Sequence, residues 1–131
     1  VDLLRFLVDS PIDDLKIYNV ADKKPCPDTF SLQLKFKEGS IATVHYFANG
    51  SKGFPKEKLE LFCDGTVLQL DNYRKLRAWG IPGFQTRRSL SQDKGQSSCC
   101  SAFLTAIENG QPSPIPFSQI LEVHRMLLMA F

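Results

Sequence analysis

Residues 30–37, with the sequence FSLQLKFK, alternate strictly between apolar and polar side chains. Successive side chains of a β-strand point to opposite faces of a sheet, so this alternation predicts a strand with one buried and one solvated face. Glu38-Gly39 then provides a tight turn into an apolar-rich segment at 41–48. The two segments together predict an antiparallel hairpin.

A helix and another strand are predicted before this hairpin. Residues 1–8 carry apolar side chains at helical spacing, and Asp9-Ser10-Pro11 ends that pattern. Residues 15–20 alternate as a strand does, and the prolines at 25 and 27 interrupt the chain after it. The first helix has no capping residue and no Met before it, so we expect the chain to begin inside a longer protein.

A second hairpin is predicted after the first one. Segments at 58–63 and 66–70 flank Asp64-Gly65, a dipeptide that tolerates the positive φ angles of a type I′ turn. A further strand is expected at 73–79, bounded by Asp71-Asn72 and by a glycine- and proline-rich segment. Residues 80–92 are predicted to form a loop.

Two helices are predicted in the last third of the chain. The first runs near 94–109, and Asn109-Gly110 closes it with residues favoured at helix C-termini. Three prolines then predict an extended linker, and Ser118 opens the last helix. Its predicted apolar stripe consists of Ile120, Leu121, His124, Leu127, Leu128 and Phe131. Strands followed by helices predict an α+β fold, a mostly antiparallel open sheet of about five or six strands with helices on one face.

Both faces of the predicted sheet are apolar enough to need a cover. Ala42, Val44, Tyr46 and Ala48 are predicted to face the helices. The opposite face is only half polar, since Ile41 and Phe47 share it with Thr43 and His45, and Phe62 points away from the side of Leu59 in the same manner. An apolar face of this kind favours contact with another domain or another subunit.

Composition bounds the class of protein. The chain of 131 residues, 43% hydrophobic and 23% charged, suits one folded domain. Its net charge of +2 is too small to predict nucleic-acid binding. The cysteines at 26, 63, 99 and 100 lack the spacing of a metal site, and no apolar run is long enough to span a membrane. We therefore expect free thiols and a cytoplasmic protein without membrane contact.

Few residues predict chemistry by themselves. No Gly-x-Gly-x-x-Gly loop follows a strand, so the chain is not expected to bind a dinucleotide alone. His124 is predicted to be a hydrogen-bonded packing residue, whereas His45 fits an interface and a solvated face equally well. Arg87-Arg88, with Lys94 nearby, favours a solvated loop over an anion site. The loop at 49–57 fits a ligand-lining segment and an ordinary surface turn about equally.

Short motifs follow one another in a characteristic order along nearly the whole chain: Asp2-Leu3-Leu4-Arg5-Phe6-Leu7-Val8, a strand pair ending in Tyr46, Pro55-Lys56-Glu57, Leu59-Glu60-Leu61-Phe62, Asp64-Gly65, Leu70-Asp71-Asn72-Tyr73, Asp93-Lys94-Gly95, Phe103-Leu104-Thr105-Ala106-Ile107 and Pro114-Ile115-Pro116-Phe117. This series resembles the C-terminal domain of the glucose-fructose oxidoreductase, inositol dehydrogenase and rhizopine catabolism proteins, the GFO/IDH/MOCA family. Many relatives have Asp-Lys-Gly-His where this chain has Gln96 after Gly95.

The resemblance implies a division of labour within a larger protein. In the family, an N-terminal Rossmann domain binds NAD or NADP and carries the catalytic Lys in a Glu-Lys-Pro motif, and a C-terminal antiparallel sheet faces the substrate. Residues 1–131 are similar to that C-terminal domain alone, without the Rossmann domain. Pro55-Lys56-Glu57 lies between strands and does not correspond to the Glu-Lys-Pro motif. The isolated chain is therefore not expected to be active, and no cofactor is expected to bind to it.

The resemblance also implies roles for particular residues. Asp2 matches a position that contacts the substrate hydroxyl or orients a His located three residues before it in the family, beyond the first residue of this chain. Lys56 and Tyr46 are expected to add hydrogen bonds to a sugar or polyol. Catalytic residues and metal ligands are not expected here. Since relatives often associate through the sheet face, a homo-oligomer is expected through Ile41, Phe47 and Phe62.

Three functions remain open from the sequence. The first is the substrate and oligomerisation half of an NAD(P)-dependent dehydrogenase of a sugar, cyclitol or related alcohol. The second is a non-catalytic interaction or dimerisation module that uses the apolar sheet face. The third is a small-ligand-binding domain that uses the loop at 49–57.

Overall fold

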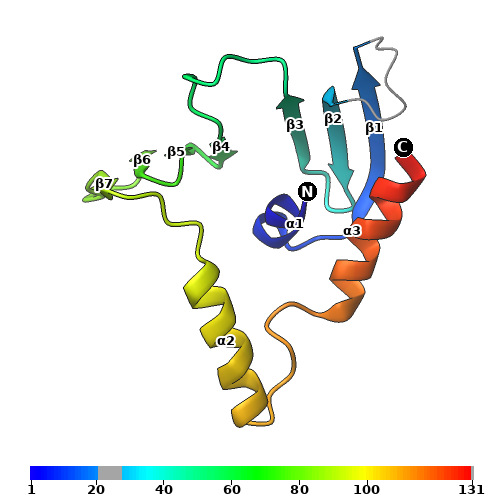
Figure 1. Cartoon of the computed structure of the whole chain (residues 1–131), viewed down its shortest axis with the longest axis vertical. Coiled ribbons are helices and arrows are strands. Elements are labelled where there is room, and N and C mark those ends of the chain that lie inside the picture. The colour runs from blue at the N-terminus through cyan, green and yellow to red at the C-terminus, as the bar shows by residue number, and fades with distance from the viewer. Residues whose placement is uncertain (21–27, 131) are drawn as a thin grey trace. The chain divides into compact units, whose positions relative to one another are not determined.

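The computed structural model describes residues 1–20 and 28–130 (Figure 1). The predicted break at Pro25 and Pro27, the predicted free thiol of Cys26, and Phe131 of the predicted stripe of the last helix lie outside these residues. The chain divides into two compact units, Val1–Gly50 with Thr105–Phe131 and Ser51–Leu104. The expectation of a single domain stays a prediction.

The first unit consists of a three-stranded antiparallel sheet and helices. The α2 helix is divided between the units, since its residues 96–104 belong to the second unit and its residues 105–108 to the first. The sheet has the strand order β1-β2-β3. The elements are α1 (Asp2–Val8), β1 (Ile12–Asn19), β2 (Thr29–Phe36), β3 (Ile41–Phe47), α2 (Gln96–Glu108) and α3 (Phe117–Ala130). The predicted hairpin is confirmed, because β2 and β3 pair from Thr29 opposite Phe47 to Lys35 opposite Ile41.

The core lies on one face of this sheet, as the alternation at 30–37 predicts. Leu34 and Phe36 are 2% and 0% exposed and pack with Ile12 and Val123. Ala42 and Val44 pack against the same cluster, which confirms their predicted direction. The α3 helix contacts β1, and α1 contacts α3 (Figure 1). Helices therefore cover this face, and the α+β class and the antiparallel pairing are confirmed.

The buried side of α3 differs from the predicted stripe by about one residue. Val123 is buried, with Met126 and Leu127 packed against the core, whereas His124 and Leu128 are exposed. The His124 Nδ1 donates a hydrogen bond to the Ile120 carbonyl oxygen, 2.8 Å away, so His124 is hydrogen-bonded but is not a core residue. The apolar residues on both sides of this helix made the two stripes similar in hydrophobicity, and packing against β1 selected one of them.

The second unit contains a four-stranded antiparallel sheet with the order β4-β5-β6-β7. Its strands are β4 (Lys58–Cys63), β5 (Thr66–Asp71), β6 (Lys75–Trp79) and β7 (Arg87–Arg88). Asp64 and Gly65 have φ angles of 44° and 74°, as the predicted type I′ turn requires. The leucine at 59 pairs with Leu70, and Phe62 pairs with Val67 on the other face, which confirms the predicted opposition.

Two predicted segments of this unit differ from the structure. Residues 87–88 were expected in a loop, but they pair with β6, where Arg87 lies opposite Leu76 and Arg88 opposite Lys75. The strand expected from Tyr73 begins at Lys75, because Asn72 and Tyr73 form the turn before it. Two residues are too short a segment for a periodic pattern, so only the pairing with β6 reveals β7.

The α2 helix ends as predicted. Gly110 has a φ angle of 60°, and its N–H and that of Gln111 donate to the carbonyl oxygens of Ile107 and Ala106. This arrangement is the Schellman motif expected of Asn109-Gly110. The apolar residues that predicted the helix remain exposed, however, with Phe103 at 52% and Ile107 at 61%.

Candidate functional site

The three residues predicted to contact substrate lie in both units. Asp2 is the first residue of α1, and Tyr46 lies near the end of β3, both in the first unit. Lys56 lies in the loop before β4, in the second unit. All three side chains are exposed and thus available to a ligand. Their roles stay predictions.

The first unit holds Asp2 and Tyr46 on firmly packed elements. Leu4 and Val8 of α1 pack against the core, and the buried Arg5 of the same helix pairs with Glu122 of α3 at 3.2 Å. The Tyr46 ring stacks on Phe30 with centroids 5.2 Å apart and an angle of 24° between the rings. The Tyr46 ring and the helix that carries Asp2 are therefore held by neighbouring side chains.

The second unit brings together three of the motifs that carried the resemblance. The Lys94 ammonium group forms an ion pair with Glu57, and the Gln92 amide donates to the other oxygen of Glu57 at 3.1 Å. Gln92 also donates to the Asn72 side-chain oxygen at 3.0 Å and to the Asn72 carbonyl at 3.2 Å. The Asn72 N–H donates to the Glu57 carbonyl at 2.6 Å. We call Glu57, Asn72, Tyr73, Gln92 and Lys94 the polar cluster.

The turn inside the polar cluster has an uncommon backbone conformation. Asn72 and Tyr73 have φ angles of 50° and 51°, in the left-handed region that a bulky residue such as Tyr rarely adopts. The segment after β7 holds this turn, because the Asp93 N–H donates to the Tyr73 carbonyl and Lys94 lies 5.9 Å from the Tyr73 ring centroid. A strained turn that its surroundings stabilise is typical of functional sites.

Electrostatics fix the charge of Glu57. The hydrogen bond from Lys94 lowers the pKa of Glu57, and Gln92 and the charge of Lys56 lower it further. The carboxylate is therefore ionised at neutral pH and anchors the backbone that leads to Lys56. Lys94 was expected near Arg87-Arg88 in a solvated loop rather than in an anion site, and in the structure it pairs with Glu57.

The polar cluster was not predicted as a unit. Its members come from three segments that are remote in sequence, and side-chain hydrogen bonds between remote segments leave no periodic pattern. The only signal was the Asp71-Asn72 turn and the Asp93-Lys94-Gly95 motif, which the sequence offered separately.

The residues predicted for a subunit interface are exposed. Ile41 and Phe47 lie at the two ends of β3 in the first unit and are 82% and 56% exposed. Phe62 lies on β4 in the second unit and is 73% exposed. His45 lies between Ile41 and Phe47 in β3, bonded through Nδ1 to the Ser31 hydroxyl at 2.8 Å and 5.3 Å from the Phe47 ring.

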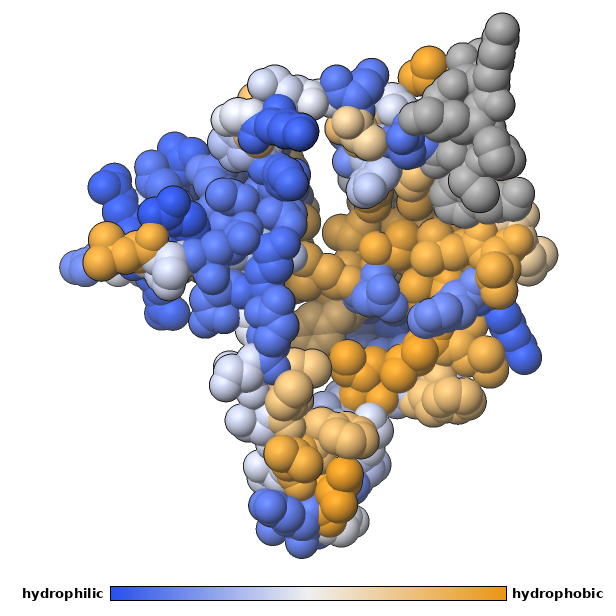
Figure 2. Space-filling model, in the orientation of Figure 1, coloured by the Kyte–Doolittle hydropathy of each residue, from blue (hydrophilic) through white to orange (hydrophobic). Residues whose placement is uncertain are grey.

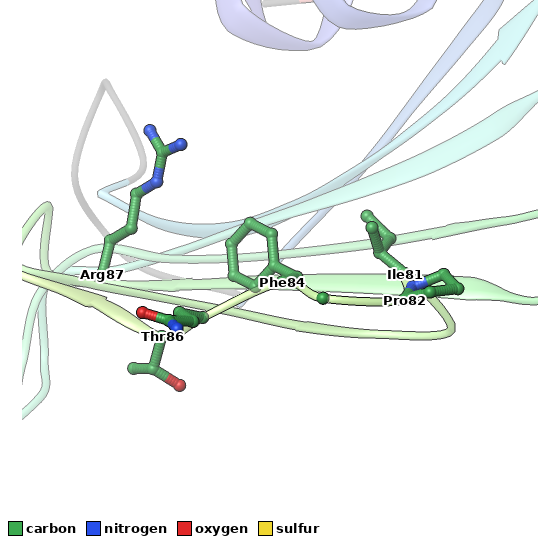
Figure 3. A pocket seen from close by; sticks show the side chains of 7 residues that line it. Ile81, Pro82, Phe84, Thr86 and Arg87 are labelled. Atoms are coloured by element: carbon green, nitrogen blue, oxygen red, sulfur yellow. The ribbon is translucent and has the colours of Figure 1, made fainter.

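A shallow hollow of about 490 Å³ lies in the loop between β6 and β7 (Figure 3). Its walls are consecutive residues of one loop, 81–87. In Figure 3 the Phe84 ring and the Arg87 side chain lie on one side of the loop, and Thr86 points to the other. Ligand sites usually combine polar groups from several elements, so this hollow is a weaker candidate for a ligand site than the polar cluster.

Residues 1–20 and 28–130 contain no cluster of His, Cys, Asp or Glu that could hold a metal ion. None of their helices is long and apolar enough to cross a membrane.

No family model and no curated protein matches the chain. Two crystal forms of UDP-N-acetylglucosamine 3-dehydrogenase from Acidithiobacillus ferrooxidans are similar in structure, with TM-scores of 0.68 and 0.72 at 18% and 16% identity. The matches cover 98% of this chain but 43% and 41% of those enzymes. The chain therefore spans about two fifths of their length, and it has the fold of part of a sugar-nucleotide dehydrogenase.

Proposed function

We propose that the chain is the C-terminal domain of an NAD(P)-dependent oxidoreductase of the GFO/IDH/MOCA family that acts on a sugar, cyclitol or related alcohol in the cytoplasm. The observation that supports this best is the fold match along 98% of the chain to an enzyme whose name describes a sugar-nucleotide dehydrogenase. The series of motifs that ends in Pro114-Ile115-Pro116-Phe117 points to the same family.

The nicotinamide cofactor would be held by another part of the parent protein. Every strand pair among residues 1–20 and 28–130 is antiparallel, and the glycines there stand in turns and loops rather than in a phosphate-binding loop between a parallel strand and a helix. These residues therefore do not fit a dinucleotide by the Rossmann route. The contribution of this chain is to bind and orient the hydroxyl-bearing substrate.

Substrate orientation follows from the way the exposed residues are held. Asp2 offers a carboxylate from a helix that is tied to the core, and Tyr46 offers a hydroxyl from a stacked ring. Lys56 offers an ammonium group next to Glu57, whose backbone the polar cluster restrains. Directional hydrogen bonds from restrained groups position a polyol for reaction, because little conformational freedom is lost on binding.

A test uses the longer, two-domain protein that this proposal implies. We expect UDP-N-acetylglucosamine or a simpler sugar or cyclitol to reduce NAD or NADP, followed by the absorbance of the reduced nicotinamide. Asp2→Ala and Lys56→Ala should each lower kcat/KM about tenfold, the effect of losing one charged hydrogen bond. Lys52→Ala, in the same loop as Lys56, serves as the matched control. Full turnover in both variants would remove Asp2 and Lys56 from the site.

The exposed apolar residues favour a second candidate, a non-catalytic module for self-association. Ile41 is 82% exposed and Phe62 is 73% exposed, so both apolar side chains would contact water in a monomer. The dehydrogenase proposal includes the same interface, so the two candidate functions differ only in whether the parent protein catalyses a reaction. Light scattering of Ile41→Glu and Phe62→Glu should show loss of an oligomer, and a monomer in the unmodified chain at high concentration would exclude the interface.

A further inference from the structure

One face of the β4–β7 sheet combines unpaired cations with the only tryptophan of the chain. Lys75, Arg77 and Trp79 alternate along β6 and therefore share this face, and Arg88 of β7 lies directly opposite Lys75. We call these four residues the basic–aromatic face. Phe62 of β4 lies in line with Val67 and Trp79 on the same side of the sheet, so the basic–aromatic face borders the residue proposed for the subunit interface. The leucine rows at 59–70 and 61–68 lie on the opposite face.

The charges on this face are not balanced. Lys58 pairs with Glu60 at 2.9 Å, and Arg77 pairs with Asp71 at 2.8 Å, so both carboxylates already have a cation. Lys75 and Arg88 have no ion pair with any residue in 1–20 or 28–130. Lys75 lies between Asp71 of β5 and Arg88 of β7, and Asp71 already pairs with Arg77. Like charges directly opposite in a sheet repel each other, and an anion placed between Lys75 and Arg88 would relieve that repulsion.

The other half of the face offers a surface for stacking. Trp79 is 49% exposed, and the Arg77 guanidinium carbon lies 5.7 Å from its ring centroid. The Arg77 Nε is buried and has no hydrogen-bond partner among the described residues. A half-exposed indole beside a guanidinium is a surface on which a nucleobase stacks.

Trp79, Arg77 and Lys75 follow one another along β6. From Trp79 to Lys75 is four residues of β6, about 13 Å. An aromatic platform, a guanidinium and a pair of cations thus follow one another over the length of an extended nucleotide. We propose that the basic–aromatic face binds a nucleoside diphosphate, with the base on Trp79 and the phosphates between Lys75 and Arg88.

This proposal needs only the second unit and goes beyond the proposed function. The similar enzyme from Acidithiobacillus ferrooxidans is named for a uridine-diphosphate sugar, whereas a nicotinamide cofactor would present adenosine phosphates. The shared chemistry is a base followed by two phosphates. UDP and ADP as separate probes distinguish the two sources.

The test is titration of the 131-residue chain with UDP, ADP and inorganic pyrophosphate at low salt. Because Trp79 is the sole tryptophan, its fluorescence should be quenched with saturation by a nucleotide. We expect pyrophosphate to bind more weakly than either nucleotide, and the affinity to fall as salt rises. Stronger binding of UDP assigns the face to the substrate side, and stronger binding of ADP assigns it to the cofactor side.

Variants separate the two halves of the face. Calorimetry should show an affinity loss of about tenfold in Trp79→Leu, from lost stacking, and about fivefold in Lys75→Gln and Arg88→Gln. Lys16→Gln on β1 removes the same charge in the first unit and should bind normally. Circular dichroism checks that each variant is folded.

Three results would overturn the proposal. The first is that neither nucleotide quenches the fluorescence with saturation. The second is that pyrophosphate and nucleotide bind with equal affinity and that Trp79→Leu has no effect. The third is that the chain binds oligouridylate and that UDP does not displace it. The last result would identify the face as a nucleic-acid surface. None of these depends on turnover in the parent protein, so the dehydrogenase proposal stands or falls separately.

Discussion

The two sheets have similar alternating sequences but different surroundings. In the first unit, Leu34 and Phe36 of β2 are 2% and 0% exposed beneath α3 and its neighbours. In the second unit, Leu59 and Leu61 of β4 alternate in the same way, yet both are only half-buried. Hydrophobic side chains gather over the first unit in Figure 2, whereas the second unit is largely hydrophilic in that view.

The comparison shows that alternation decides direction and not burial. A period of two sends apolar side chains to one face, but an element must cover that face before they leave water. The first unit is therefore stabilised mainly by its core. The second unit relies more on turns, ion pairs and side-chain hydrogen bonds, and mutations should distinguish the two.

The largest effect is expected from Phe36→Ala in the first unit. Phe36 is fully buried, so its truncation leaves a cavity and should lower the free energy of unfolding by about 3–5 kcal/mol. The control is Phe54→Ala in the second unit, where the ring is 73% exposed and the loss should stay below about 0.5 kcal/mol. Urea denaturation measures both. Equal losses would contradict the difference between the units.

The next effect concerns the buried charge of the first unit. Glu122 accepts from Arg5 at 3.2 Å and from the Ile12 N–H at 2.5 Å, and the Arg5 side chain is 8% exposed. Glu122→Gln leaves that guanidinium without its carboxylate and should destabilise the fold by about 2–3 kcal/mol. The other carboxylate near Arg5 belongs to Asp9, whose side chain is 88% exposed. Asp9→Asn should therefore lower the free energy of unfolding by less than about 0.5 kcal/mol.

The second unit should respond to changes of backbone conformation. Gly80 and Gly83 have φ angles of 79° and 76°, but a Cβ at Gly80 would overlap the Gly65 carbonyl oxygen, whereas one at Gly83 meets nothing within 4 Å. Gly83→Ala should cost about 1 kcal/mol and Gly80→Ala about 2 kcal/mol more. Thermal unfolding compares them, and similar melting temperatures would exclude the close approach at Gly80.

The smallest effect is the pH dependence of the polar cluster. The pKa of Glu57 is lowered from its usual 4.5, mainly by the Lys94 hydrogen bond. A carboxyl group with a lowered pKa stabilises the folded state above its unfolded pKa, and this contribution is lost as the pH falls through the folded pKa. Glu57→Gln should therefore flatten the loss of stability below pH 4.5, which urea denaturation at a series of pH values measures.

Local patterns predicted most elements of the fold. The alternation at 30–37, the Asp64-Gly65 turn and the Asn109-Gly110 helix end are each contained within a few residues, and each is found in the structure. Errors occurred where two local solutions were nearly equal. The buried side of α3 differs from the predicted stripe by about one residue, because apolar side chains lie on both sides of that helix.

The candidate site was predictable in part. The motifs of the sequence predict substrate contacts for Asp2, Tyr46 and Lys56, and these roles stay predictions. The sequence did not show that Glu57, Asn72, Gln92 and Lys94 meet. It also gave no indication that Arg88 lies opposite Lys75, since residues 87–88 were expected in a loop. Contacts of this kind join segments that are separated by a turn or by a whole strand.

By itself, the sequence determined the longer antiparallel strands, the end of α2 and the direction of the side chains in the first hairpin, because these depend on backbone preferences and on a period of two residues. The tertiary structure decided which apolar face became a core and which cations remained without a carboxylate. Burial and charge balance depend on neighbours that are distant in the chain, and hydrogen bonds between such neighbours form only when the sheets are assembled.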